Sequence, residues 1–163
     1  MRIILKNKET LVYDDFIFKC CVGKNGISTK KIEGDKKTPK GIFSLGPLFF
    51  RNDRVKSPKT KIKKIKINKS MGWCDDPKSK KYNKLIEKKN EFKHENLYRK
   101  DNIYDLLIPI HYNTKNPKKN KGSAIFLHLT KNYKKTLGCI ALKKKDMLIL
   151  LRLINKNTKI IIN

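Results

Sequence analysis

Apolar and polar residues alternate with a period of two, or form short apolar blocks, through much of the chain. This pattern is typical of β-strands. It predicts strands at Arg2–Lys6, Phe16–Val22, Ile42–Leu45 and Lys61–Ile67, with a turn at Tyr13–Asp15. In the fourth segment isoleucine alternates with lysine, so only one of its faces is apolar.

Two later segments, Ile103–Ile110 and Ser123–Leu129, are almost continuously apolar. Such runs indicate central strands that are buried on both faces. Two other segments, Lys78–Lys100 and Asn113–Lys121, are polar and irregular, and we expect them to be loops.

One segment has the period of a helix. Met147, Leu150, Leu151 and Ile154 follow the i, i+3, i+4, i+7 spacing of a single apolar helix face. The segment 158–162 after it is apolar and predicts a closing strand.

These elements predict one mainly β domain over residues 1–163, a sandwich or partly closed barrel with loops and one late helix. The chain has 163 residues, enough for one hydrophobic core. No apolar run approaches the ~18 residues of a membrane span, since Arg152 interrupts the longest run, Met147–Ile154.

The chain is strongly basic, with 41 Lys and Arg against 14 Asp and Glu and a formal net charge of +27. This charge favours affinity for anionic polymers or membrane surfaces. Nearly all the cations are lysine, and Asn and Ile are also abundant, as in a compositional bias of the source. Specific nucleic-acid readers use arginine forks and stacking aromatics. No such interleaving is present, so we expect no specific nucleic-acid partner.

The amino terminus, Met1–Lys6, lacks the long apolar region and the small-residue cleavage site of a secretory signal. A cytoplasmic location, export by another signal and a processed chain all remain open.

The four cysteines are Cys20, Cys21, Cys74 and Cys139. No pair has the C-x-x-C spacing of zinc ribbons and thioredoxin-like sites, and we expect no metal. In a strand, Cys20 and Cys21 would point to opposite faces, which suits packing better than a mutual disulfide.

The richest chemistry lies between His128, at the end of an apolar run, and Cys139, 11 residues later and directly after Gly138. A strand, a loop and a return strand would bring the two side chains together. An imidazole can deprotonate a thiol or hold it as a thiolate–imidazolium pair. Gly138 permits close backbone approach, and the amides around Cys139 could form an oxyanion hole. A buried cysteine and a satisfied core histidine are the alternative.

Three blocks here resemble the YkuD-type L,D-transpeptidase family. Residues 38–43, Thr-Pro-Lys-Gly-Ile-Phe, are similar to its T-P-x-G-x-F segment. The His128 strand followed by Thr136–Cys139 resembles its catalytic block, and residues 146–162 resemble its terminal helix and strand.

The resemblance implies an L,D-transpeptidase-like fold and a cysteine acyltransferase. Cys139 would attack the third residue of a peptidoglycan tetrapeptide stem, expel D-alanine and pass the thioester to an acceptor amine. His128 would move the protons. No cofactor is implied, the expected location is the cell envelope or periplasm, and a carbapenem should form an adduct.

The sequence departs from the family at three points. Leu137 replaces the histidine of Ser-His-Gly-Cys, and Ala141 replaces the Arg or Asn two residues after the cysteine. The spacing from His128 to Cys139 is also shorter than usual. A lysine or arginine from elsewhere is therefore expected to hold a substrate carboxylate.

Further residues are candidates for substrate contacts. Trp73, Asp75 and Tyr82 could line a stem-peptide groove, although a structured turn explains the region 71–83 equally well. Thr136 belongs to the catalytic block, and His111 could lie beside His128 on a neighbouring strand. Cys74 with His94 or His111 is a rival nucleophile–base pair.

Two other functions remain open. Hydrolysis of the same thioester would make the protein an L,D-carboxypeptidase. A non-catalytic basic module that binds anionic glycan or nucleic acid is the alternative outside enzymes.

Overall fold

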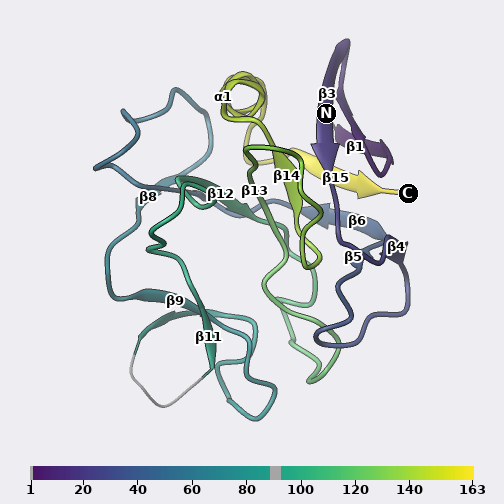
Figure 1. The fold of residues 1–163 in the computed structure, drawn as a ribbon, viewed down its shortest axis with the longest axis vertical. Helices are drawn as coiled ribbons and strands as arrows, with labels where there is room; N and C mark the ends of the chain where they lie inside the picture. Colours follow the sequence, from purple (N-terminus) through teal and green to yellow (C-terminus); the bar gives the residue numbers. More distant parts are fainter. Residues whose placement is uncertain (1, 89–92) are drawn as a thin grey trace.

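The computed structural model describes residues 2–88 and 93–163. Within them, ten strands form one curled mixed sheet, and the amino-terminal strand pairs in parallel with the carboxy-terminal one (Figure 1). In order across the sheet, the strands are β6 (Gly41–Ser44), β15 (Lys159–Ile162), β1 (Arg2–Asn7), β2 (Thr10–Tyr13), β3 (Phe16–Cys21), β14 (Ile140–Leu142), β13 (Phe126–Leu129), β12 (Leu106–Pro109), β7 (Leu48–Phe50) and β8 (Lys64–Lys66). The predicted mainly β fold is confirmed.

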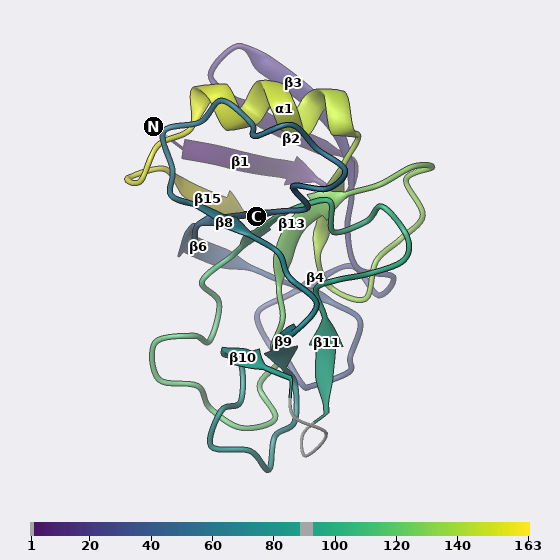
Figure 2. The ribbon, with the colours of Figure 1, turned by 90° about the vertical axis from the view of Figure 1, so that its left-hand side faces the viewer.

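The predicted late helix is α1 (Lys144–Leu153), which lies along β1 and β2 in Figure 2. Its buried side chains, Met147, Leu150 and Leu151, join the large core together with residues of β1, β2 and β15. Asp146 lies in the first turn, where a negative charge is favourable to the helix dipole. With 10 residues, this helix is not long enough to cross a membrane, and the described part of the chain has no other candidate.

Strand β13 is buried on both faces, as its apolar sequence predicts. Leu127 and Leu129 point into the large core on the helix side of the sheet. Phe126 belongs to a second core on the opposite face, which also contains Trp73 and Leu107. Because side chains alternate along a strand, His128 lies on the same face as Phe126.

The second core is closed by a small sheet in the order β10 (Leu85–Glu87), β9 (Met71–Cys74) and β11 (His94–Asn96), seen at the bottom of Figure 2. Its two outer strands lie within 78–100, which we expected to be a loop. Each spans only three residues, Leu-Ile-Glu in β10 and His-Glu-Asn in β11, which is too short for a period-two pattern to show in the sequence. Residues 89–92 of that prediction lie outside the described part.

Other boundaries differ from the expected ones. The run 61–67 forms a strand only at β8, because pairing with β7 extends over three residues. Strand β2 was not predicted, and it makes the hairpin with β3 across the expected turn. A separate two-stranded parallel ribbon consists of β4 (Ile27–Ser28) and β5 (Thr38–Pro39).

The packing of α1 makes a testable prediction. Leu150→Ala should lower the free energy of unfolding by about 2–5 kcal/mol, because it leaves a cavity in the large core. Lys145→Ala, on the exposed side of the same helix, should change it by less than about 0.5 kcal/mol. Denaturant unfolding followed by circular dichroism measures both. Equal effects of the two substitutions would mean that the helix does not anchor the core.

Candidate active site

Cys139 follows a tight turn that leads into β14, and Thr136 holds this turn closed. The Thr136 hydroxyl donates to the carbonyl of Cys139 (2.6 Å) and accepts the N–H of Gly138 (3.1 Å). The backbone of Thr136 is itself tied down, since its N–H donates to the Val22 carbonyl (2.9 Å). A short polar side chain therefore fixes both ends of the turn.

Glycine is required at the position before the nucleophile. Gly138 has φ +138°, which side chains rarely adopt, and a Cβ there would lie 2.9 Å from the carbonyl oxygen of Lys37. The loop 31–38 therefore packs directly against the turn, because Gly138 carries no side chain.

The Cys139 thiol is buried and hydrogen-bonded. Its sulfur accepts the N–H of Phe126 and its S–H donates to the carbonyl of Ala124, each at 3.3 Å. Burial raises the pKa of the Cys139 thiol to about 12, against the opposing effect of the Phe126 N–H. The resting side chain is a neutral thiol.

The His128 ring is oriented by a backbone carbonyl of its own strand. Its Nδ1 lies 2.8 Å from the Leu129 carbonyl, which can only accept, so the proton is on Nδ1 and Nε2 is the basic nitrogen. Burial lowers the His128 pKa to about 4, although the bond to Leu129 opposes this shift. The imidazole is therefore neutral at neutral pH.

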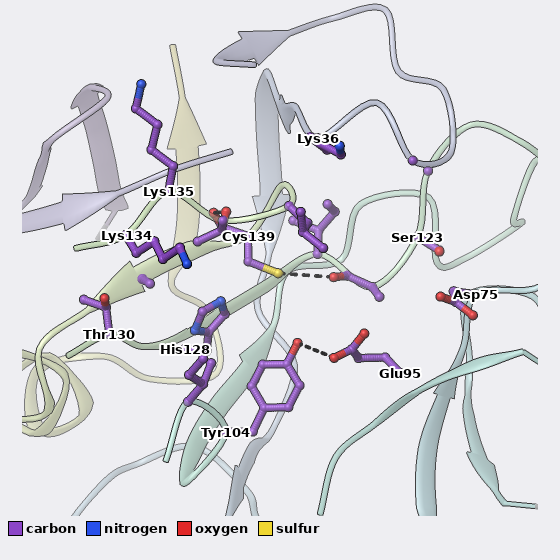
Figure 3. Close-up of a pocket in the computed structure, with 18 of the residues that line it drawn as sticks. Lys36, Asp75, Glu95, Tyr104, Ser123, His128, Thr130, Lys134, Lys135 and Cys139 are labelled. Carbon is purple, nitrogen blue, oxygen red and sulfur yellow. Dashed lines mark hydrogen bonds between the residues drawn. The ribbon is translucent and has the colours of Figure 1, made fainter. Parts of the chain in front are cut away.

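The parallel pairing of β13 with β14 brings the two groups together. His128 pairs with Ala141, two residues beyond Cys139, and both groups line one cavity of about 570 Å³ (Figure 3). Burial raises the pKa of the thiol and lowers the pKa of the imidazole, so it favours an uncharged pair over thiolate and imidazolium.

Both acidic and basic side chains line the cavity. Glu33, Asp75 and Glu95 lie in its wall, although the whole chain has only 14 acidic residues. Lys134 and Lys135 line it from the loop that precedes the nucleophile turn. A ligand that carries both signs of charge matches this arrangement.

Tyr104, Glu95 and Arg99 form a group that the sequence analysis missed. The Tyr104 hydroxyl donates to Glu95 Oε1 (3.1 Å), which also accepts from Arg99 (2.9 Å). The Tyr104 ring lies edge-on to His128, with centroids 5.4 Å apart. The spacing of Glu95 and Arg99 at i, i+4 was the available signal, but these residues lie in a segment taken for a loop.

Asn83, at the end of the candidate region 71–83, is hydrogen-bonded to the backbone beside Cys139. Its carbonyl oxygen accepts the N–H of Ala124 (3.0 Å) and the indole N–H of Trp73 (2.9 Å). Ala124 has φ +52° and presents its carbonyl to the Cys139 thiol. The buried Asn83 amide thus helps to orient Ala124, whose carbonyl accepts the hydrogen bond from the Cys139 thiol.

Trp73 and Tyr82 do not line the cavity, which corrects the prediction that they face a stem-peptide groove. Trp73 is in the second core, edge-on to Phe126 with centroids 5.3 Å apart. Tyr82 is buried, and its hydroxyl donates to Glu33. Tyr82 therefore contacts the cavity wall from behind, through Glu33, and Trp73 packs in the core beneath it.

Of the remaining predicted substrate contacts, Asp75 and Thr136 line the cavity. Burial raises the pKa of Asp75, reinforced by Glu33 and Glu95 against the effect of Lys93. His111 is exposed and outside the cavity lining, with Nδ1 3.2 Å from the Thr114 hydroxyl. The expected position beside His128 is wrong, because β12 is antiparallel to β13 and places Leu107 there.

The other cysteines lie elsewhere. Cys74 is fully buried in β9, opposite His94 of β11, and does not line the cavity. Cys20 and Cys21 are buried in β3 and form no disulfide, in agreement with the prediction that they are packing residues. The geometry therefore favours Cys139 over the rival pair.

Among residues 2–88 and 93–163, no group of three His, Cys, Asp or Glu side chains could hold a metal ion.

The model of the YkuD family, described as the L,D-transpeptidase catalytic domain, matches residues 2–162. The chain belongs to this family. No curated protein matches the chain. The family match covers the curled sheet, the helix and the cavity with Cys139 and His128, and it supports a peptidoglycan-related enzyme.

The buried neutral His128 makes stability depend on pH. In the folded protein, the pKa of His128 is about 4, below its ordinary value of 6.5, so the unfolded chain binds the proton first as pH falls. Wild type should lose roughly 3 kcal/mol of unfolding free energy between about pH 6.5 and pH 4, measured by urea unfolding at each pH. His128→Gln should remove most of this slope. An unchanged slope in the variant would contradict a neutral buried imidazole.

Proposed function

We propose that this protein is a cysteine-dependent L,D-transpeptidase that acts on peptidoglycan stem peptides. The observation that carries the proposal is the pairing of Cys139 and His128 in one cavity, within a chain of the L,D-transpeptidase family. Hydrogen bonds hold the thiol in place, and the bond from Nδ1 to Leu129 leaves Nε2 free of that proton.

The reaction has two balanced halves. Cys139 Sγ attacks the carbonyl carbon of the third stem residue while its proton passes to His128 Nε2. The C–N bond to the terminal D-alanine breaks, and that amine leaves with the proton from His128. An acceptor amine then attacks the thioester, gives its proton to His128, and the C–S bond breaks to restore the thiol.

The resting charge state favours general-base catalysis. The high pKa of Cys139 and the low pKa of His128 both come from burial, so a preformed ion pair is disfavoured. Proton transfer therefore accompanies attack. The oxyanion would form beside the turn, where the Gly138 N–H is already bonded to Thr136, so the Cys139 N–H is the candidate donor.

Lys134 is the candidate for holding a substrate carboxylate. Ala141 leaves the position beside His128 small, and Lys134 extends toward His128 and Cys139 in Figure 3. The exposed backbone of this loop is anchored by the Cys21 thiol, which donates to the Lys134 carbonyl (3.3 Å). An ammonium here would attract the terminal carboxylate of the stem.

Covalent capture tests the nucleophile. Incubation with a carbapenem should add one ring-opened drug molecule to wild type, and intact mass spectrometry should detect it. Cys139→Ala should give no adduct, and the matched control Cys74→Ala should give the wild-type adduct. An adduct that persists in Cys139→Ala would assign the chemistry to another residue.

Stem-peptide turnover distinguishes transfer from hydrolysis. With a tetrapeptide donor and an amine acceptor, we expect release of D-alanine and a cross-linked dimer by chromatography and mass spectrometry. His128→Gln should lower the rate by at least ~100-fold, the usual contribution of a general base. D-alanine release without dimer would make the protein an L,D-carboxypeptidase. No turnover by wild type would refute the proposed function.

A further inference from the structure

One lysine is buried in the wall of the cavity, in contrast to the exposed lysines that give the chain its charge. The side chain of Lys31 is 4% exposed. A buried ammonium is unfavourable unless hydrogen bonds and an opposite charge compensate for its lost hydration. The contacts of the Lys31 ammonium therefore show which groups compensate for its burial.

The compensation comes entirely from the loop 31–38. Lys31 Nζ donates to the Asp35 carboxylate and to the Lys37 carbonyl, the latter at 2.6 Å. Asp35 also accepts the N–H groups of Ile32 (3.0 Å) and Lys37 (2.9 Å). Burial opposes ionisation of Asp35, but the bonds from Lys31 and these amides lower its pKa. The Lys31 ammonium and the Asp35 carboxylate therefore hold the loop 31–38 in a compact conformation through their hydrogen bonds.

This loop touches the nucleophile turn through the carbonyl that Lys31 binds. The Lys37 oxygen lies 2.9 Å from the place of a Cβ on Gly138. The neighbouring Lys36 oxygen lies 2.4 Å from the place of a Cβ on Gly23, and Gly23 bridges to Thr136. Movement of the loop would therefore displace the turn that carries Cys139.

Lys31 also lies in the wall of the cavity that contains Cys139. Its positive charge favours the thiolate, whereas Glu95 opposes it. Titratable or charged groups from several elements line the same cavity. They are Glu33, Asp35 and Lys36 in the loop, Asp75 just after β9, Lys93 and Glu95 at β11, Arg99 and Tyr104 before β12, His128 on β13, and Lys131, Lys134 and Lys135 before β14.

We propose that Lys31 is a positioning residue for Cys139. Its ammonium fixes the Lys37 carbonyl against Gly138 and provides a cation in the wall beside the thiol when the thiolate forms. This inference rests on the proposed function only in taking Cys139 as the nucleophile.

The test is the pH dependence of Cys139 alkylation by iodoacetamide, quantified on the Cys139 peptide by mass spectrometry. Lys31→Met should raise the apparent pKa of the thiol and slow its alkylation at a fixed alkaline pH by about 3–10-fold, since one pKa unit is tenfold in thiolate. Asp35→Asn removes the carboxylate that pairs with the Lys31 ammonium, and it should lower the apparent pKa of the Cys139 thiol. Lys30→Met removes an exposed charge directly before the loop and should leave the pH profile of alkylation unchanged.

A purely structural role would lower the melting temperature of Lys31→Met without moving the pKa of Cys139, and that result would overturn the proposal. An equal shift in Lys30→Met would also overturn it. If Lys31→Met does not fold, Asp35→Asn decides, because an unchanged or raised pKa there contradicts the proposed charge effect. Alkylation needs no peptidoglycan, so failure of stem-peptide turnover leaves this test intact.

Discussion

The arrangement of this molecule depends on the burial of β13 on both faces. Leu127 and Leu129 anchor it to the large core beneath α1, and Phe126 anchors it to the second core above the small sheet. A shift of β13 by one residue would exchange its two faces and turn His128 away from the cavity into the large core. This constraint sets which way the imidazole points. It also positions β14, whose parallel pairing brings Cys139 to the same cavity.

The site combines reactive groups with surroundings that keep them unreactive at rest. Burial disfavours both the thiolate and the imidazolium, so the shifts in pKa of Cys139 and His128 have the same cause. The thiol proton meanwhile has a defined acceptor in the Ala124 carbonyl, oriented by Asn83. A substrate carbonyl close to the sulfur would make proton transfer to His128 productive, which limits side reactions of a free thiolate.

Charge has different roles at the surface and in the cavity. The net charge of +27 comes mainly from exposed lysines, and it suits association with an anionic polymer such as the cell wall. Inside the cavity, Lys31 is paired with Asp35, and three further carboxylates, Glu33, Asp75 and Glu95, line the wall. Local pairing, rather than net charge, therefore determines the electrostatics that a substrate meets.

The sequence by itself determined the mainly β class and the late helix, and it singled out His128 and Cys139 as candidates, because these signals depend on local periodicity and on short motifs. Alternation of apolar residues is a local property, and so is the glycine that the turn before Cys139 requires. The family resemblance extended these signals to a fold, which the match over residues 2–162 supports.

Only the tertiary structure decided which polar residues surround the nucleophile. Asn83, Glu95 and Tyr104 are distant from Cys139 in the sequence and lie in or beside segments without regular periodicity, so no local pattern linked them to the site. Trp73 and Tyr82 were misassigned for the same reason: residue type suggested binding, but burial depends on what packs above a residue. His111 was misplaced because the direction of β12 relative to β13 is set by pairing between distant strands.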